Sequence, residues 1–319
     1  MVDRRLSRFV MLALIVVACG SPRPTVTTPP TAATSPSSTP TSAVPALDPE
    51  LADVWLAFSR GEASHSNIFV GRANGDEVRQ VTTGTDFRYN PAWSPDGTRI
   101  AYRVEGPEGA SPDPERDGIW VVNADGSSNF SLSAVSGVIG AGQSQPWSPD
   151  GNQVVMSGRT PGDQLRIWLM NADGSEARPL TPATYEAQYP AWSPDGGRIA
   201  FSAVIDGGFR LMIMNADGSG IRELTDGPTD NWPSWSPDGS RIVFGRSEGL
   251  VVMNADGSDI RTITTELGVP ATWAPAETIA ANCSLEGQEI AMCIVGQDGT
   301  IAPLLAGGDG GFPAWRPEP

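Results

Sequence analysis

The chain has 319 residues, of which 39% are hydrophobic, enough for a sizeable core. It carries 37 acidic side chains against 21 basic ones, for a formal net charge of −16, and it contains no lysine. Nucleic-acid affinity comes mainly from clustered Lys and Arg side chains, and because the sequence has no such cluster, nucleic acid is excluded as a partner.

The first 18 residues have the pattern of an export signal. Three arginines within the first eight residues precede a short apolar run over residues 9–17, which is too short to span a bilayer. The run ends in Val-Val-Ala-Cys19, which resembles the bacterial lipoprotein signal, in which the cysteine is acylated. We predict a signal peptide over residues 1–18 and a lipidated Cys19 that anchors the protein outside the cytoplasm. An ordinary signal peptide cut nearby is the alternative.

Residues 19–50 are predicted to form a disordered tether. After Cys19 they are mainly Pro, Thr, Ser and Ala, a composition that cannot bury a core and favours extended conformations. The folded part therefore begins near residue 51 and is held to the membrane only through the lipid.

Residues 51–319 contain two alternating motifs with a spacing near forty residues, which indicates stacked supersecondary units. Trp-Ser-Pro-Asp-Gly and its degraded copies start at Trp93, Trp147, Trp192, Trp235, Trp273 and Trp315. Asn-Ala-Asp-Gly-Ser starts at Asn123, Asn171, Asn215 and Asn254. Both motifs are turn sequences, in which Pro presets φ, Asn bonds back to the backbone and Gly takes the positive φ.

Short apolar runs separate the motifs, such as residues 199–201 and 211–214. They are continuously apolar, so both faces of each strand should be covered, as they are when sheets stack face to face. Each unit then has four strands, A to D in chain order. The innermost one, strand A, ends at the Trp, B follows the Pro-Asp-Gly turn, C precedes Asn-Ala-Asp-Gly and D follows it.

The two ends of the domain are predicted to complete one sheet. Three strands over residues 55–59, 68–72 and 78–82 lack a preceding Trp strand, and the chain ends on an A strand around Trp315. Pairing them removes two open sheet edges. The fold class predicted is all-β: a six-bladed β-propeller of four-stranded antiparallel blades with a one-plus-three closure.

These repeats resemble the TolB-type, WD40-like β-propeller repeat over residues 51–319. The resemblance implies the propeller fold but leaves function open, since the same repeat builds translocation proteins, the propeller of prolyl-oligopeptidase-like peptidases and surface lipoproteins.

Catalysis is not expected. His65 is the only histidine and is predicted to lie in the loop between strands B and C of the closure blade. A catalytic triad or a multi-histidine metal site would have to depend on this one residue. The motif aspartates are explained as turn residues, and each turn offers a single carboxylate where Ca²⁺ prefers six to eight oxygens. We therefore expect no cofactor and no metal.

Cys283 and Cys293 flank the turn of one predicted hairpin. If that turn centres near Gln288, the two cysteines face each other, and outside the cytoplasm a disulfide between them is reasonable. Two free buried thiols are the alternative.

The candidate binding residues lie where the chain enters each innermost strand, near the central channel. The six repeat tryptophans are best explained as blade-packing residues, whereas the residues just before them are polar or aromatic and vary between blades. The set is Arg88, Tyr89, Asn90, Gln145, Gln188, Tyr189, Asn231, Trp232 and Phe312. They lie on the face that carries the variable D-to-A and B-to-C loops, here called the loop face; the longest of these loops spans residues 105–118.

The leading hypothesis is therefore a monomeric, lipid-anchored propeller, on the cell surface or in the periplasm, that binds an envelope protein or a peptide-like partner through the loop face. A glycan or small ligand at the channel mouth, held by Tyr89, Tyr189, Trp232 and Phe312, is the alternative. An enzyme of the propeller lyase or lactonase type would need clustered carboxylates or histidines on this face, and the histidines are missing.

Overall fold

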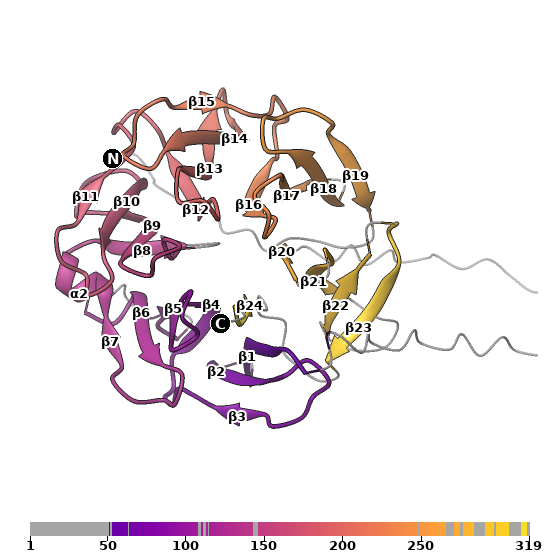
Figure 1. The fold of residues 1–319 in the computed structure, drawn as a ribbon. Coiled ribbons are helices and arrows are strands. Elements are labelled where there is room, and N and C mark those ends of the chain that lie inside the picture. Colours follow the sequence, from indigo (N-terminus) through magenta and orange to yellow (C-terminus); the bar gives the residue numbers. More distant parts are fainter. Residues whose placement is uncertain are drawn as a thin grey trace, which may run out of the picture. The chain divides into compact units, whose positions relative to one another are not determined.

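The computed structural model describes residues 51, 53–62, 64–107, 110, 113, 115–142, 146–247, 249–265, 271–274, 277–283, 291–296, 298–305 and 314–317. These residues form six four-stranded antiparallel sheets arranged around a centre (Figure 1). The prediction of a six-bladed all-β propeller is confirmed.

Blade 1 holds the first three strands and the last one. Its strands, from the innermost outward, are β24 (Ala314–Trp315), β1 (Trp55–Glu62), β2 (His65–Arg72) and β3 (Arg79–Gln80). Leu56 is paired with Trp315, and Ala57 with Ala314. The predicted one-plus-three closure is therefore confirmed.

The other five blades follow in chain order, each built from consecutive strands. Blade 2 contains β4 (Phe87–Trp93), β5 (Arg99–Glu105), β6 (Gly118–Asn123) and β7 (Phe130–Ser131), and blade 3 contains β8 (Ile139–Gly142), β9 (Gln153–Arg159), β10 (Arg166–Asn171) and β11 (Arg178–Pro179). Blade 4 contains β12 (Ala187–Trp192), β13 (Arg198–Ile205), β14 (Gly208–Asn215) and β15 (Arg222–Glu223). Blade 5 contains β16 (Asn231–Trp235), β17 (Arg241–Arg246), β18 (Gly249–Asn254) and β19 (Arg261–Thr264), and blade 6 contains β20 (Ala271–Trp273), β21 (Ile279–Cys283), β22 (Ala291–Val295) and β23 (Ile301–Leu305).

In the described part of the chain the core is divided into six apolar clusters, one between each pair of adjacent blades. Between blades 4 and 5, for example, Leu211 of β14, Phe244 of β17 and Met253 of β18 belong to one cluster, and all three side chains are fully buried. Both faces of the middle strands are covered in this way, as the continuous apolar runs predicted. The repeat tryptophans belong to the same clusters, and Trp235 is only 1% exposed.

The two turn motifs lie together at one end of every complete blade, here called the turn face. In blade 2 the Ser94 hydroxyl donates to Asp96 Oδ1 at 2.6 Å and accepts from the Arg99 N–H, while Gly97 has φ +65°. The neighbouring turn bonds directly to it, because the Ala124 N–H donates to the Thr98 carbonyl. Adjacent blades interlock through the same motif, since a Cβ on Gly196 would lie 3.5 Å from Cδ of Pro149.

One detail of the second motif differs from the prediction. The side chain that bonds back to the backbone is the aspartate, whose Oδ1 accepts from the Ser127 N–H in Asn123–Ser127. The Asn123 amide donates to the Ser127 hydroxyl instead. The Asp side chain therefore bonds to the backbone of the turn, and the Asn side chain adds a hydrogen bond to the Ser side chain.

Blade 3 departs furthest from the repeat. Its innermost strand β8 ends at Gly142, and Trp147 forms only an isolated bridge with Val154. The strand is preceded by an unpredicted helix, α2 (Leu132–Ser136), whose first turn is capped by the Ser131 hydroxyl and which ends at Gly137 with φ +69°. Among the described residues, no helix is both long and apolar enough to cross a membrane.

Candidate functional site

The innermost strands are kinked on the loop-face side of the channel. Asn90, Tyr189 and Trp232 occupy the same place in blades 2, 4 and 5, each three residues before the repeat Trp and each followed by Pro. Their φ angles are +55°, +55° and +57°, in the left-handed region that non-glycine residues seldom adopt. The register of each strand shifts at this point, as in a β-bulge. Backbone strain of this kind gathers at functional sites and needs firm support from its surroundings.

The kinks bring aromatic side chains from different blades together. The rings of Tyr189 and Trp232 are stacked, with centroids 3.5 Å apart and an interplanar angle of 22°. The Tyr189 ring also packs against β8, where a Cβ on Gly142 would lie 3.0 Å from the ring. The small residues of β8 therefore make room for a tyrosine that reaches over blade 3.

Blade 2 adds a polar group beside this pair. The Tyr89 hydroxyl donates to Glu105 Oε2, and Arg103 bridges the two, with its Nη2 at 3.5 Å from Glu105 Oε2 and its Cζ at 5.6 Å from the Tyr89 ring centroid. We call Tyr89, Arg103, Glu105, Tyr189 and Trp232 the mouth cluster.

Burial controls the ionisation of both phenols in the mouth cluster. It raises the pKa of Tyr89 and of Tyr189, and the charge of Arg103 opposes both shifts only in part. Both hydroxyls therefore stay protonated and can donate hydrogen bonds at neutral pH. Three buried polar atoms in or beside the cluster have no hydrogen-bond partner among the described residues: Arg103 Nε, Asn231 Oδ1 and Ser202 Oγ. Unsatisfied buried groups of this kind are uncommon in folded proteins.

An ion pair fixes the segment that carries Trp232. Asp230 is fully buried and accepts from Arg246 Nε at 2.7 Å and from Nη2 at 2.8 Å. Its backbone N–H donates to the Phe209 carbonyl of blade 4, and the Phe209 N–H donates to the Pro228 carbonyl. The loop before β16 is thus held by blade 4 and by its own blade, so the direction of Trp232 is set by the fold.

The structure places the nine predicted binding residues in several environments. Tyr89, Tyr189 and Trp232 come together in the mouth cluster, with Gln188 and Asn231 half-buried beside them. Asn90 faces the central pocket described below, and Arg88 lies in a separate side pocket. Gln145 and Phe312 lie outside the described residues. Arg103, Glu105 and Asp230 were missed because their roles depend on strand pairing and on a buried partner.

The side pocket that holds Arg88 lies beneath the longest loop and has a volume of about 260 Å³. Arg88 is paired there with Asp86 at 3.2 Å, and the buried Tyr102 hydroxyl donates to Asn129 Oδ1 at 2.8 Å. Burial raises the pKa of Tyr102 to about 12. Internal partners thus engage Arg88 Nη2 and the Tyr102 hydroxyl, whereas Arg88 Nε has no hydrogen-bond partner among the described residues. No residue of the mouth cluster is among the described residues that line this pocket.

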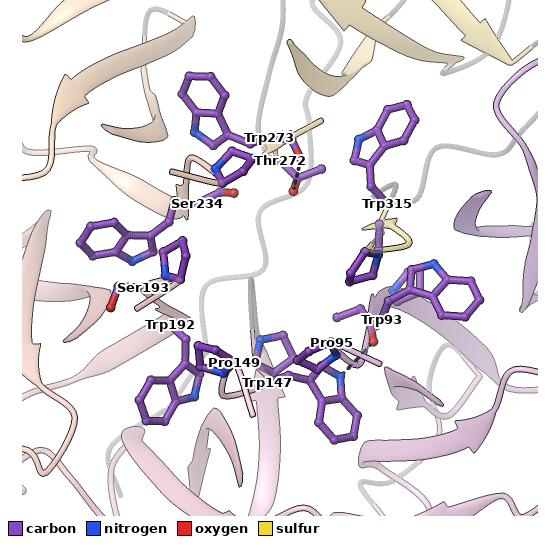
Figure 2. A pocket seen from close by; sticks show the side chains of 18 of the residues that line it. Trp93, Pro95, Trp147, Pro149, Trp192, Ser193, Ser234, Thr272, Trp273 and Trp315 are labelled. Atoms are coloured by element: carbon purple, nitrogen blue, oxygen red, sulfur yellow. Dashed lines mark hydrogen bonds between the residues drawn. The ribbon is translucent and has the colours of Figure 1, made fainter. Parts of the chain in front are cut away.

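A larger pocket of about 390 Å³ lies at the turn-face half of the channel. All six repeat tryptophans line it, together with Pro95, Pro149, Pro194, Pro237 and Pro317. Figure 2 shows the indoles pointing away from the central space, with Pro95 and Pro149 nearer to it. The tryptophans therefore pack the blades as predicted, but the motif also builds a pocket on the face opposite to the predicted one.

The described residues do not form a catalytic or metal-binding group around His65. His65 is the first residue of β2 and not part of a loop as predicted, since it pairs with Glu62. Its Nδ1 lies 3.2 Å from the Ser64 hydroxyl, and His65 lines neither of the pockets above. In the part of the chain that the structure describes, no group of three or more His, Cys, Asp or Glu side chains is placed to hold a metal ion.

The cysteine hairpin has a different register from the one assumed. Cys283 is opposite Ala291, and Cys293 is opposite Ala281, so the two cysteines occupy diagonal and not facing positions. Cys293 is fully buried and disulfide-bonded. The side chain of Cys283 lies outside the described residues, so its pairing with Cys293 stays a prediction.

Comparison with known proteins identifies the repeat. Residues 113–318, more than half of the chain, match the TolB beta propeller domain family. Among curated proteins, the chain is 32% identical to the "Uncharacterized peptidase YuxL" of Bacillus subtilis over 126 residues, which are 39% of this chain and 18% of the peptidase. It is 28% identical to the "Protein TolB homolog" of Chlorobium luteolum over 158 residues, which are 50% of this chain and 33% of that protein. The chain thus spans a third or less of the length of these relatives.

Among solved structures, TolB from Acinetobacter baumannii has a similar fold. The TM-score is 0.70 at 18% sequence identity, and the match covers 87% of this chain and 69% of the other. At this identity the likeness concerns the fold alone, so any function has to be argued from the sites.

Proposed function

The chain belongs to the TolB β-propeller family, and from this premise we propose that it is a binding scaffold that recognises an envelope protein through its loop face. In this proposal residues 1–18 are a signal peptide, Cys19 is lipidated, and residues 19–50 tether the propeller outside the cytoplasm.

The mouth cluster is the observation that carries the proposal. Trp, Tyr and Arg are the side chains that contribute most to protein–protein binding, and they do so best from rigid, partly buried positions. Here Tyr189 and Trp232 stand on left-handed kinks, Arg103 lies on the regular strand β5, and the Asp230–Arg246 pair fixes the segment that carries Trp232. Little side-chain entropy is left to lose when a partner binds.

Binding is favoured over catalysis by what surrounds the cluster. Its carboxylate, Glu105, is engaged by the Tyr89 hydroxyl and Arg103, and His65 has no part in it. The peptidase relative resembles this chain over 18% of its own length, so that likeness does not bring a peptidase activity with it.

A glycan is the second candidate ligand, and the stacked Tyr189–Trp232 pair favours it. Aromatic rings with polar neighbours suit the faces of sugar rings, and Asn231 and Gln188 supply amides beside them.

The test is co-purification of the full chain from an envelope extract of its own host. We expect a protein partner that is retained by the wild type and lost from Trp232→Ala and Tyr189→Ala. Ile260→Ala is the matched control, since Ile260 is 40% exposed beside a turn of blade 5 and should leave retention unchanged. A partner held equally by all variants would overturn the assigned face, and loss of retention on adding envelope glycans would favour the second candidate.

The anchor needs its own test. In the wild type, Cys19 should direct the chain into the detergent phase of a membrane extract, and Cys19→Ser should leave it in the aqueous phase. Equal partition of the two would refute lipidation at Cys19 without touching the assignment of the loop face.

A further inference from the structure

We propose that the central pocket on the turn face binds a small, uncharged, mainly apolar molecule. This inference goes beyond the proposed function and concerns the opposite end of the channel from the mouth cluster.

The pocket has the size and character of a ligand site. Its volume of about 390 Å³ falls in the range of small-molecule pockets, roughly 300–1,000 Å³. Its walls come from all six blades, and proline rings and tightly packed tryptophans have few rotamers to lose. The pocket is therefore already formed before anything binds.

Charge decides which ligand fits. The chain has a net charge of −16, yet among the described residues no charged side chain lines this pocket, and the polar side chains that line it, besides the indole N–H groups, are those of Asn90, Ser193, Ser234 and Thr272. An ion that entered would lose water and find no opposite charge, which is costly. A neutral apolar group would lose little and would displace water from proline and alanine carbons.

The nearest cations are engaged elsewhere. Arg99, Arg198 and Arg241 each lie over the indole of the next blade, with Cζ 4.8, 4.9 and 4.8 Å from the ring centroids of Trp147, Trp235 and Trp273. Arg316 lies likewise over Trp93 at 5.5 Å. These arginines brace the walls and are not residues that line the cavity. An anionic ligand therefore gains no direct partner there.

The wall also explains how the pocket stays open. In five blades the residue before the repeat Trp lines the pocket and is small or a proline: Ala92, Pro146, Ser234, Thr272 and Ala314. A larger side chain at one of these positions should fill the space. Thr272 is the best site for this change because it lines the pocket, is half-buried and lies on the short strand β20.

The experiment compares three probes of similar shape by ligand-observed NMR on the full chain: methyl benzoate, benzoate and benzylamine. Methyl benzoate should bind at least ten times more tightly than either charged probe. Thr272→Phe should abolish its binding, whereas Thr184→Phe, a matched change at an exposed loop position, should not. If Thr272→Phe fails to fold, as judged by circular dichroism, Ala314→Leu takes its place.

Three outcomes would overturn the proposal: no binding of methyl benzoate, equal binding of the charged probes, or binding that both filling variants retain. Trp232→Ala should leave probe binding unchanged, and Thr272→Phe should leave retention of the envelope partner unchanged. Failure of the pocket and failure of the loop-face proposal are thereby distinguishable.

Discussion

The buried pair Asp230–Arg246 allows the support of the mouth cluster to be tested quantitatively. In the wild type the two carboxylate oxygens of Asp230 lie 2.7 and 2.8 Å from Arg246 Nε and Nη2. Replacing Asp230 with Asn removes the negative charge and one of these two acceptor oxygens. Breaking one partner of a buried pair costs about 3–5 kcal/mol when the other charge is left uncompensated. Arg246 keeps 27% of its side chain exposed, so water can offset part of the loss. We therefore expect a loss of about 2–3 kcal/mol in the free energy of unfolding.

The matched control is Asp163→Asn. Asp163 pairs with Arg166 at 2.6 Å but is 24% exposed, whereas Asp230 is fully buried, so about 1 kcal/mol or less is expected. In thermal unfolding, 2–3 kcal/mol corresponds to a fall in Tm of roughly 5–10 °C for a domain of this size. Near-ultraviolet circular dichroism should weaken below the transition if the Tyr189–Trp232 stack loosens. Equal losses for Asp230→Asn and Asp163→Asn would refute the reasoning.

Two further predictions concern the turns and the ring of tryptophans. The Ser236 hydroxyl, followed by the Ser240 N–H and hydroxyl, lowers the pKa of Asp238 to about 2, below its usual value of about 3.9 in an unfolded chain. The stability that Asp238 contributes is therefore present above about pH 3.9 and lost as pH falls towards 2, so urea midpoints of wild type and Asp238→Asn should converge over that window; a constant difference would contradict this. Gln153 of blade 3 occupies the position at which blades 2, 4 and 5 carry an arginine over the tryptophan of the next blade. Gln153→Arg should therefore contact Trp192 and stabilise the fold by about 0.5–1 kcal/mol. An unchanged or lower urea midpoint would argue against this contact.

The sequence allowed the architecture to be predicted because each level of local information agreed. Turn residues, continuous apolar strands and the two motifs all point to the same repeat, and the incomplete pieces at Trp55 and Trp315 have one way to pair. Two details of blade 3 were not predicted. Its innermost strand ends at Gly142, before Trp147, and the five-residue helix α2 is too short to show a helical periodicity in the sequence.

The sites were less predictable for a physical reason. Tyr89, Tyr189 and Trp232 could be found by comparing equivalent positions between blades, since they depart from the repeat. Arg103 and Asp230 could not, because the contacts of Arg103 with Tyr89 and of Asp230 with Arg246 depend on how neighbouring strands pair. The central pocket was missed because tryptophans that pack between blades also shape the space at their centre, and only the assembled ring shows that space.

The closure of blade 1 has a consequence for how the protein is made. Leu56 and Ala57 are synthesised more than 250 residues before their partners Trp315 and Ala314. Until then β1 presents an unpaired strand edge, which is prone to pair with another chain. The five later blades can form in order during translation, whereas the ring closes only once residues 314 and 315 have emerged, as expected for contacts between distant parts of a chain. A nascent chain arrested before residue 314 should therefore be the species most inclined to associate with its own copies.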